Sequence, residues 1–134
     1  MRLFVDTGAW FALVNDRDQN HVRATGFAER FGNESLLLYT TDYVIDEAAT
    51  MIRLKLSHRK AVDFLNWTAG SASVTRAHVA PDLLARGEEI FRKYRDKEWS
   101  YTDCVSFAYM DEMGLEDAFA FDRNFSQYGK RLHP

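Results

Sequence analysis

Three aspartates and one glutamate stand where carboxylates could hold a metal ion. Asp6 directly follows the short apolar run Leu3–Val5, and Asp122 directly follows Ala118–Phe121. Because the carboxyl ends of parallel strands meet at one edge of a sheet, both side chains are expected at that edge. Either aspartate alone has an ordinary explanation, since aspartate after a strand often forms a turn that caps the next helix.

Asp103 and Glu47 lie on predicted helices and strengthen the interpretation as a site. Ser100 and Asp103 have the spacing of a capping box, which stabilises a helix start but also directs a carboxylate toward the strand edge. Glu47 has no lysine or arginine within one helical turn, so a local surface ion pair does not explain it. We therefore predict that Asp6, Glu47, Asp103 and Asp122 converge.

Four neighbouring carboxylates repel one another, and this repulsion must be relieved. Two unit charges about 5 Å apart repel each other by roughly 3 kcal/mol at an effective dielectric constant of about 20. Such a cluster must take up protons or bind cations, and all-oxygen ligands favour Mg²⁺ or Mn²⁺ over zinc. An ion of this kind can activate a water molecule against a phosphodiester. The hydroxyls of Thr7, Thr102 and Ser106 are expected to orient ligands or water around it.

The elements that position these acids alternate between short apolar strands and amphipathic helices. We predict strands at Leu3–Val5, Leu36–Tyr39, Ser73–Val79 and Ala118–Phe121, with a short edge strand at Arg131–Pro134. We predict helices at Ala9–Val14, His21–Phe31, Thr41–Leu56, Arg59–Thr68, Pro81–Tyr94 and Ser100–Met113. This alternation predicts an α/β fold with a parallel sheet of four or five strands and helices on both faces.

Composition excludes several classes of protein. The 134 residues suit one domain, residues 1–134, and 17 basic against 20 acidic residues give a net charge of −3. A broadly basic nucleic-acid-binding protein is therefore excluded, and any RNA contact must be local. The single cysteine, Cys104, cannot form an internal disulfide, and we expect it to be a buried small side chain. Neither a membrane span nor a signal peptide is recognisable, so we expect a cytoplasmic protein without membrane association.

Four motifs together resemble a known family over essentially the whole chain. They are Val5-Asp6-Thr7, Asp46-Glu47, Tyr101-Thr102-Asp103 with Ser106, and Phe121-Asp122-Arg123-Asn124-Phe125. In order and spacing they resemble a PIN domain, and most of all a VapC-type toxin ribonuclease of a type II toxin–antitoxin pair. The resemblance implies a metal-dependent endoribonuclease that binds Mg²⁺ or Mn²⁺ through Asp6, Glu47, Asp103 and Asp122, with Thr7, Thr102 and Ser106 as polar support. One departure is Ala120, because many relatives carry a hydroxyl residue two positions before the last acid.

The resemblance also implies partners. Such toxins act on RNA, form homodimers and are silenced by a small antitoxin protein. We expect Arg123, Lys130 and Arg131 to contact RNA, because they follow Asp122 at the predicted active edge.

Two other readings of the acids remain open. A haloacid-dehalogenase-like phosphatase needs an Asp-x-Asp pair after the first strand, whereas Gly8 stands two residues after Asp6. A non-catalytic module could be receiver-like, which requires adjacent acids at the first strand, or a PIN fold that only binds RNA, which should have lost one of the four acids.

Overall fold

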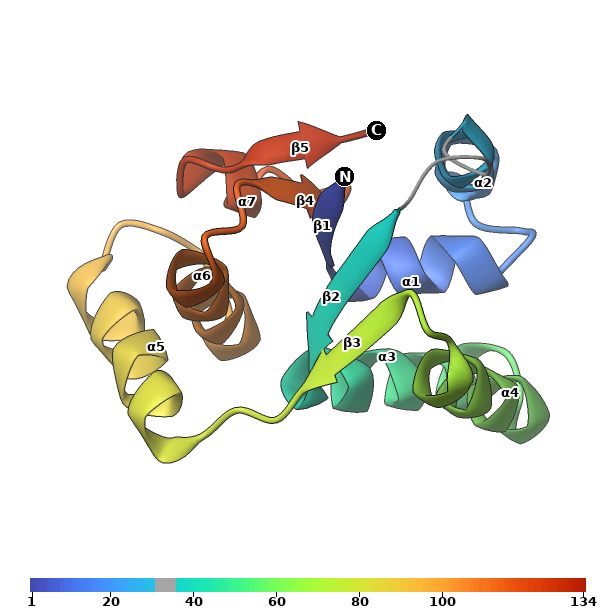
Figure 1. Ribbon diagram of the computed structural model, residues 1–134, viewed down its shortest axis with the longest axis horizontal. Coiled ribbons are helices and arrows are strands. Elements are labelled where there is room, and N and C mark those ends of the chain that lie inside the picture. The colour runs from blue at the N-terminus through green and yellow to red at the C-terminus, as the bar shows by residue number, and fades with distance from the viewer. Residues whose placement is uncertain (31–35) are drawn as a thin grey trace.

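The computed structural model describes residues 1–30 and 36–134, and its strands form one parallel sheet. The strand order is β3-β2-β1-β4-β5 (Figure 1). Phe4 on the central strand is in register with Tyr39 on one side and Ala118 on the other. The bounds are β1 Arg2–Val5, β2 Leu37–Thr41, β3 Val74–Ala77, β4 Asp117–Phe119 and β5 Arg131–His133. The predicted α/β fold with a parallel sheet is confirmed, including the edge strand near the C-terminus.

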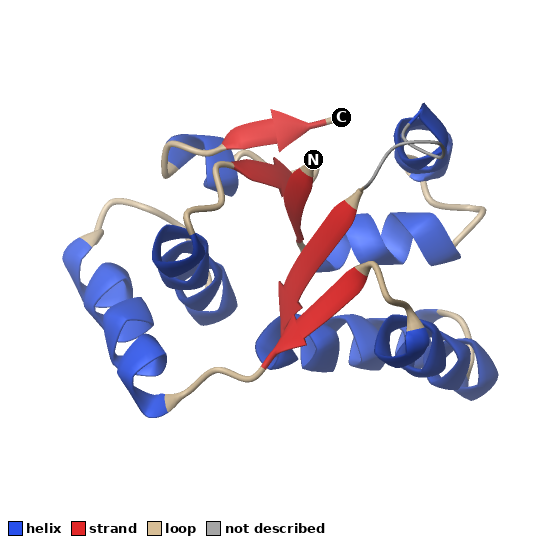
Figure 2. Ribbon diagram, in the orientation of Figure 1, coloured by secondary structure: helices blue, strands red, loops and turns tan. Residues whose placement is uncertain are grey.

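Helices cover both faces of this sheet. Figure 2 shows α5 and α6 on one side and α1, α3 and α4 on the other. The bounds are α1 Thr7–Val14, α2 His21–Arg30, α3 Asp42–Lys55, α4 His58–Gly70, α5 Pro81–Lys93, α6 Tyr101–Met113 and α7 Asn124–Gln127. The six predicted helices are found with small shifts at their ends, the predicted end at Phe31 lies outside the described residues, and α7 was not predicted. No helix in the described part of the chain combines the length and apolar character needed to cross a bilayer.

Local capping explains where the helices next to the sheet edge begin. The Thr41 hydroxyl accepts a hydrogen bond from the backbone N–H of Val44 at the start of α3. At the start of α6, Ser100 and Asp103 form the predicted capping box in both directions. The strand residues Leu3, Phe4 and Val5 have no exposed surface, as expected for a parallel sheet covered on both faces.

A glycine allows α5 and α6 to approach each other closely. A Cβ atom on Gly87 of α5 would lie 2.9 Å from the Val105 Cα atom of α6. We expect Gly87→Ala to lower the free energy of unfolding by about 1 to 3 kcal/mol, because the helices must separate to admit the methyl group. Gly26→Ala is the control, since a Cβ atom there meets nothing within 4 Å. Urea denaturation should show no destabilisation of the control, and equal loss in both variants would contradict the packing argument.

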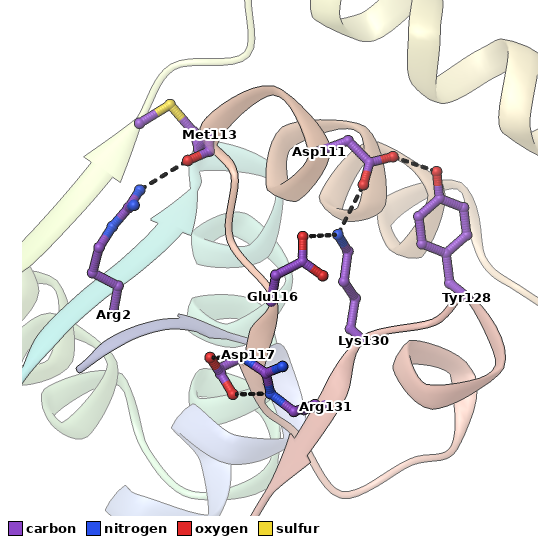
Figure 3. Close-up of polar contacts among 8 residues, drawn as sticks. All are labelled: Arg2, Asp111, Met113, Glu116, Asp117, Tyr128, Lys130 and Arg131. Atoms are coloured by element: carbon purple, nitrogen blue, oxygen red, sulfur yellow. Dashed lines mark hydrogen bonds and ion pairs between the residues drawn. The ribbon is translucent and has the colours of Figure 1, made fainter.

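The edge of the sheet formed by the amino ends of the strands carries a separate polar network, shown in Figure 3. The buried Lys130 ammonium lies 2.8 Å from Asp111 Oδ1 and 3.5 Å from Glu116 Oε1. Arg131 binds Asp117 through two hydrogen bonds of 2.9 and 3.0 Å. The prediction that Lys130 and Arg131 lie at the active edge is wrong. Because β5 runs parallel to β4, the chain between them must return to the opposite edge before β5 begins.

This network predicts a particular response to acid. The hydrogen bonds from Arg131 lower the pKa of Asp117 from its usual value of 3.8 to about 2. A lowered carboxyl pKa stabilises the fold above the unfolded value and loses that contribution as the pH falls through the folded value. We therefore expect Asp117→Asn to lower the free energy of unfolding at pH 7 by about 1 to 2 kcal/mol, and by much less at pH 2. Urea denaturation at both pH values measures this, and an equal loss at both would contradict it.

Candidate metal centre

The carboxyl ends of two neighbouring strands and the start of one helix bring three acids together. Asp6 directly follows β1, Asp122 lies three residues after β4, and Asp103 is in the first turn of α6. One carboxylate oxygen from each lies within 4.8 Å of the others. Asp6 and Asp103 are only 6% and 8% exposed, whereas Asp122 is exposed. The arrangement is therefore two buried carboxylates and one that faces solvent.

Glu47, the fourth predicted acid, stands on the rim of this cluster. It is exposed on α3, and its Oε1 accepts a hydrogen bond of 2.6 Å from the Thr7 hydroxyl. It lines the same hollow of about 510 Å³ as the three aspartates and is close enough to raise the pKa of Asp6. The Thr7 hydroxyl therefore holds the Glu47 carboxylate, and its role in supporting a metal site stays a prediction.

Asn124 holds the acids in place, although the sequence placed it only within the motif around Asp122 and predicted no role for it. Its side-chain amide donates to Asp103 Oδ2 over 2.9 Å, and its backbone N–H donates to Asp122 Oδ1 over 2.9 Å. The same Asp103 oxygen accepts the backbone N–H of Ser100. The backbone bond from Asn124 supports Asp122 in a chain where Ala120, which is buried, has no hydroxyl to do so. The backbone bond had a signal in sequence, because an aspartate side chain such as that of Asp122 commonly accepts the N–H two residues later. The amide bond to Asp103, 21 residues away in sequence, had none.

The remaining predicted support residues make other contacts. The Ser106 hydroxyl is fully buried and donates to the backbone carbonyl of Thr102 over 2.8 Å, so this bond is directed along the helix rather than to an acid. Thr102 is half-buried beside Asp103. Cys104 is buried, as expected, and burial raises the pKa of its thiol to about 11, which makes a thiolate nucleophile unfavourable.

The electrostatics of the cluster favour a bound cation. Burial, together with the charges of Asp103 and Asp122, raises the pKa of Asp6 well above its usual value. Burial also raises the pKa of Asp122, and the charges of Asp103 and Glu47 add to this. A divalent cation would relieve this repulsion, and an all-oxygen donor set suits Mg²⁺ or Mn²⁺. The residues present therefore fit a hard divalent ion.

Comparison with known proteins shows the family to which the chain belongs. A sequence model of the PIN domain matches residues 3–131. The chain belongs to the PIN domain family.

This PIN domain has relatives with recorded activities. It is 34% identical over 128 residues to the 23S rRNA-specific endonuclease VapC20 of Mycobacterium tuberculosis, covering 95% of this chain and 94% of the relative. The crystal structure of VapC20, described as a sarcin–ricin loop cleaving toxin, superposes with a TM-score of 0.88 at 31% identity over 98% of this chain and 99% of that one. FitAcB from Neisseria gonorrhoeae shares the fold at 14% identity, with a TM-score of 0.69 over 100% of this chain and 97% of that one.

These matches confirm the resemblance to VapC-type PIN toxins. They decide against the phosphatase and receiver-like readings, because the family match and the fold extend over nearly the whole chain. A PIN domain of this type is a nuclease and therefore a hydrolase.

Asn124 is expected to be a positioning residue of this PIN domain. Asn124→Ala removes the amide that fixes Asp103 but keeps the backbone N–H to Asp122. We expect cleavage to fall by about 10- to 100-fold, the usual range for residues that orient metal ligands. High concentrations of Mg²⁺ or Mn²⁺ should restore part of the loss, which a misfolded variant would not show. Ser126→Ala on the same short helix is the control, and a loss of equal size there would contradict the assignment.

Proposed function

We propose that this PIN domain is the toxin of a type II toxin–antitoxin pair and hydrolyses RNA phosphodiesters with Mg²⁺ or Mn²⁺. The observation that carries the proposal is the convergence of Asp6, Asp103 and Asp122 within 4.8 Å at the carboxyl edge of the sheet. Asp103 also caps α6, but stability does not explain why all three acids converge, because their charges oppose one another.

The chain's own residues have distinct parts in this activity. Asp6, Asp103 and Asp122 would hold the ion, with Glu47 as a further carboxylate on the rim. When bound, Mg²⁺ or Mn²⁺ supplies charge neutralisation at the phosphate and lowers the pKa of a coordinated water. Thr7 keeps Glu47 directed into the hollow, and Asn124 keeps Asp103 in position.

The sarcin–ricin loop of 23S rRNA is the substrate that we propose. The support is the relative named for this specificity, which matches almost the whole length of both chains. We also propose a cognate antitoxin, a homodimeric state and a cytoplasmic location. A fold shared with VapBC2 from Rickettsia felis, at a TM-score of 0.74 and 8% identity over 99% of this chain and 98% of that one, is in keeping with an antitoxin partner.

The test uses purified protein and defined RNA. A stem-loop with the sarcin–ricin sequence and one with the same stem and a scrambled loop are incubated with Mg²⁺, Mn²⁺ or a chelator. We expect one specific cut in the first RNA only, and only with a divalent ion. Equal cutting of both RNAs would remove the substrate proposal, and absence of cutting with either ion would remove the nuclease proposal. The second outcome would favour the RNA-binding, non-catalytic reading.

A further inference from the structure

We infer that a second hollow beside the acidic cluster binds a backbone phosphate next to the scissile one, through Lys97 and Arg123. This inference rests on the proposed ribonuclease function. The hollow has a volume of about 430 Å³ and lies between the loop joining α5 to α6 and the segment that follows β4.

The two hollows are neighbours. Phe121 and Asp122 line both the second hollow and the one that contains the three aspartates. The Arg23 guanidinium lies over the Phe121 ring, 5.4 Å from its centroid, and so packs against this shared wall. An RNA strand whose scissile phosphate sits at the acids would therefore have its next phosphate near the second hollow, because successive phosphates are only one nucleotide apart.

Two cationic side chains, Lys97 and Arg123, line the second hollow and are the candidate phosphate contacts. Arg123 is exposed, and the Lys97 ammonium lies 3.7 Å from a carboxylate oxygen of its neighbour Asp96, which is also exposed. Such a pair is weak and leaves the ammonium available to a phosphate. The contrast is with Lys130 and Arg131, which the network at the opposite edge already engages. Glu98 and Asp122 also line the hollow, and their charges oppose anion binding. A divalent ion held by the acids would neutralise Asp122, which leaves Glu98 as the opposing charge, so its removal should strengthen binding.

The walls of the hollow are held in position before any ligand arrives. The Trp99 indole N–H, on the loop before α6, donates to Gln127 Oε1 on α7 over 3.0 Å. Trp99 is buried and packs edge-on against Phe107. Because the Gln127 oxygen is engaged by Trp99, its amide N–H groups are the donors that it offers to the hollow. A fixed geometry reduces the entropy that binding must overcome.

The experiment measures RNA binding separately from cleavage. In the Asp103→Asn background, fluorescence anisotropy with the labelled sarcin–ricin stem-loop gives the affinity at several salt concentrations. We expect Lys97→Ala and Arg123→Ala each to weaken binding by about 3- to 10-fold and to lower the salt slope by about 0.7 to 1. Glu98→Gln should instead strengthen binding. In the cleaving protein, Lys97→Ala and Arg123→Ala should raise KM more than they lower kcat.

Matched controls come from α4, which is well separated from α7 in Figure 1. Arg59→Ala and Lys60→Ala remove the same charges from exposed positions there and should leave affinity and salt slope nearly unchanged. If Lys97→Ala and Arg123→Ala behave like these controls, the subsite is wrong even when the protein cleaves RNA. If the Asp103→Asn protein binds no RNA and the parent cuts none, the proposed function itself fails.

Discussion

Replacing Asp103 by asparagine should reduce RNA cleavage by at least about 100-fold while the protein stays folded. Two donors, the Ser100 N–H and the Asn124 amide, hold Asp103 Oδ2. In the variant these donors retain the amide oxygen at that position, so the NH₂ group takes the place of the other carboxylate oxygen. The cluster then presents hydrogen-bond donors where a cation requires an acceptor. Cleavage of the sarcin–ricin stem-loop with Mg²⁺ or Mn²⁺ measures the loss.

The same reasoning predicts that stability changes little. The capping box survives, because an amide oxygen accepts the Ser100 N–H as a carboxylate does. The loss of a charge near the helix start costs about 0.3 to 1 kcal/mol, and relief of repulsion within the cluster offsets it. Asp63→Asn, at an exposed position on α4, is the control and should cleave at the parental rate. Cleavage by Asp103→Asn at a rate near that of the control would contradict the site.

The sequence was sufficient for the sheet and for the convergence of three acids, because both follow from local rules. Leu3–Val5 is a short apolar run that ends at a turn signal, which favours a buried strand, and an acid that directly follows such a strand lies at its carboxyl end. The start of α6 was equally clear, since Ser100 and Asp103 specify the cap by themselves. Features set within four residues of one another could therefore be predicted.

Lys130 and Arg131 show where such reasoning stops. Because both follow Asp122 within nine residues, the sequence predicted them at the active edge. The intervening α7 instead carries the chain to the opposite edge. A helix of four residues is too short to show a hydrophobic period, so the sequence did not predict it. Ser106 was placed correctly on the face of Asp103, yet its hydroxyl donates to the Thr102 carbonyl one turn earlier in the same helix. Serine commonly bonds in this way within helices, and the prediction of a supporting role did not take this local alternative into account.

Asp6→Asn should abolish cleavage and, in the metal-free protein, raise thermal stability. Burial and the neighbouring Asp103 and Asp122 raise the pKa of Asp6. A raised carboxyl pKa means that the metal-free fold loses stability as the pH rises from the unfolded value through the folded one. Asparagine does not titrate, so its advantage should be near zero at pH 4 and largest at pH 8. Relief of about 1 to 2 kcal/mol corresponds to a rise in Tm of about 3 to 8 °C.

Divalent ions should reverse the ranking of the two proteins, and this reversal separates a metal centre from a merely strained acidic cluster. An ion that binds the folded parent with a Kd of about 1 mM adds about 1.4 kcal/mol at about 10 mM, whereas a variant that lacks a ligand gains little. Thermal melts at pH 8 with chelator, Mg²⁺ or Mn²⁺ measure both effects, with Asp63→Asn as the control. If the ions stabilise Asp6→Asn as much as the parent, they bind elsewhere. If Asp6→Asn is the less stable protein without ions, the Asp6 carboxylate stabilises the fold. Repulsion from Asp103 and Asp122 is then not the dominant effect at this position.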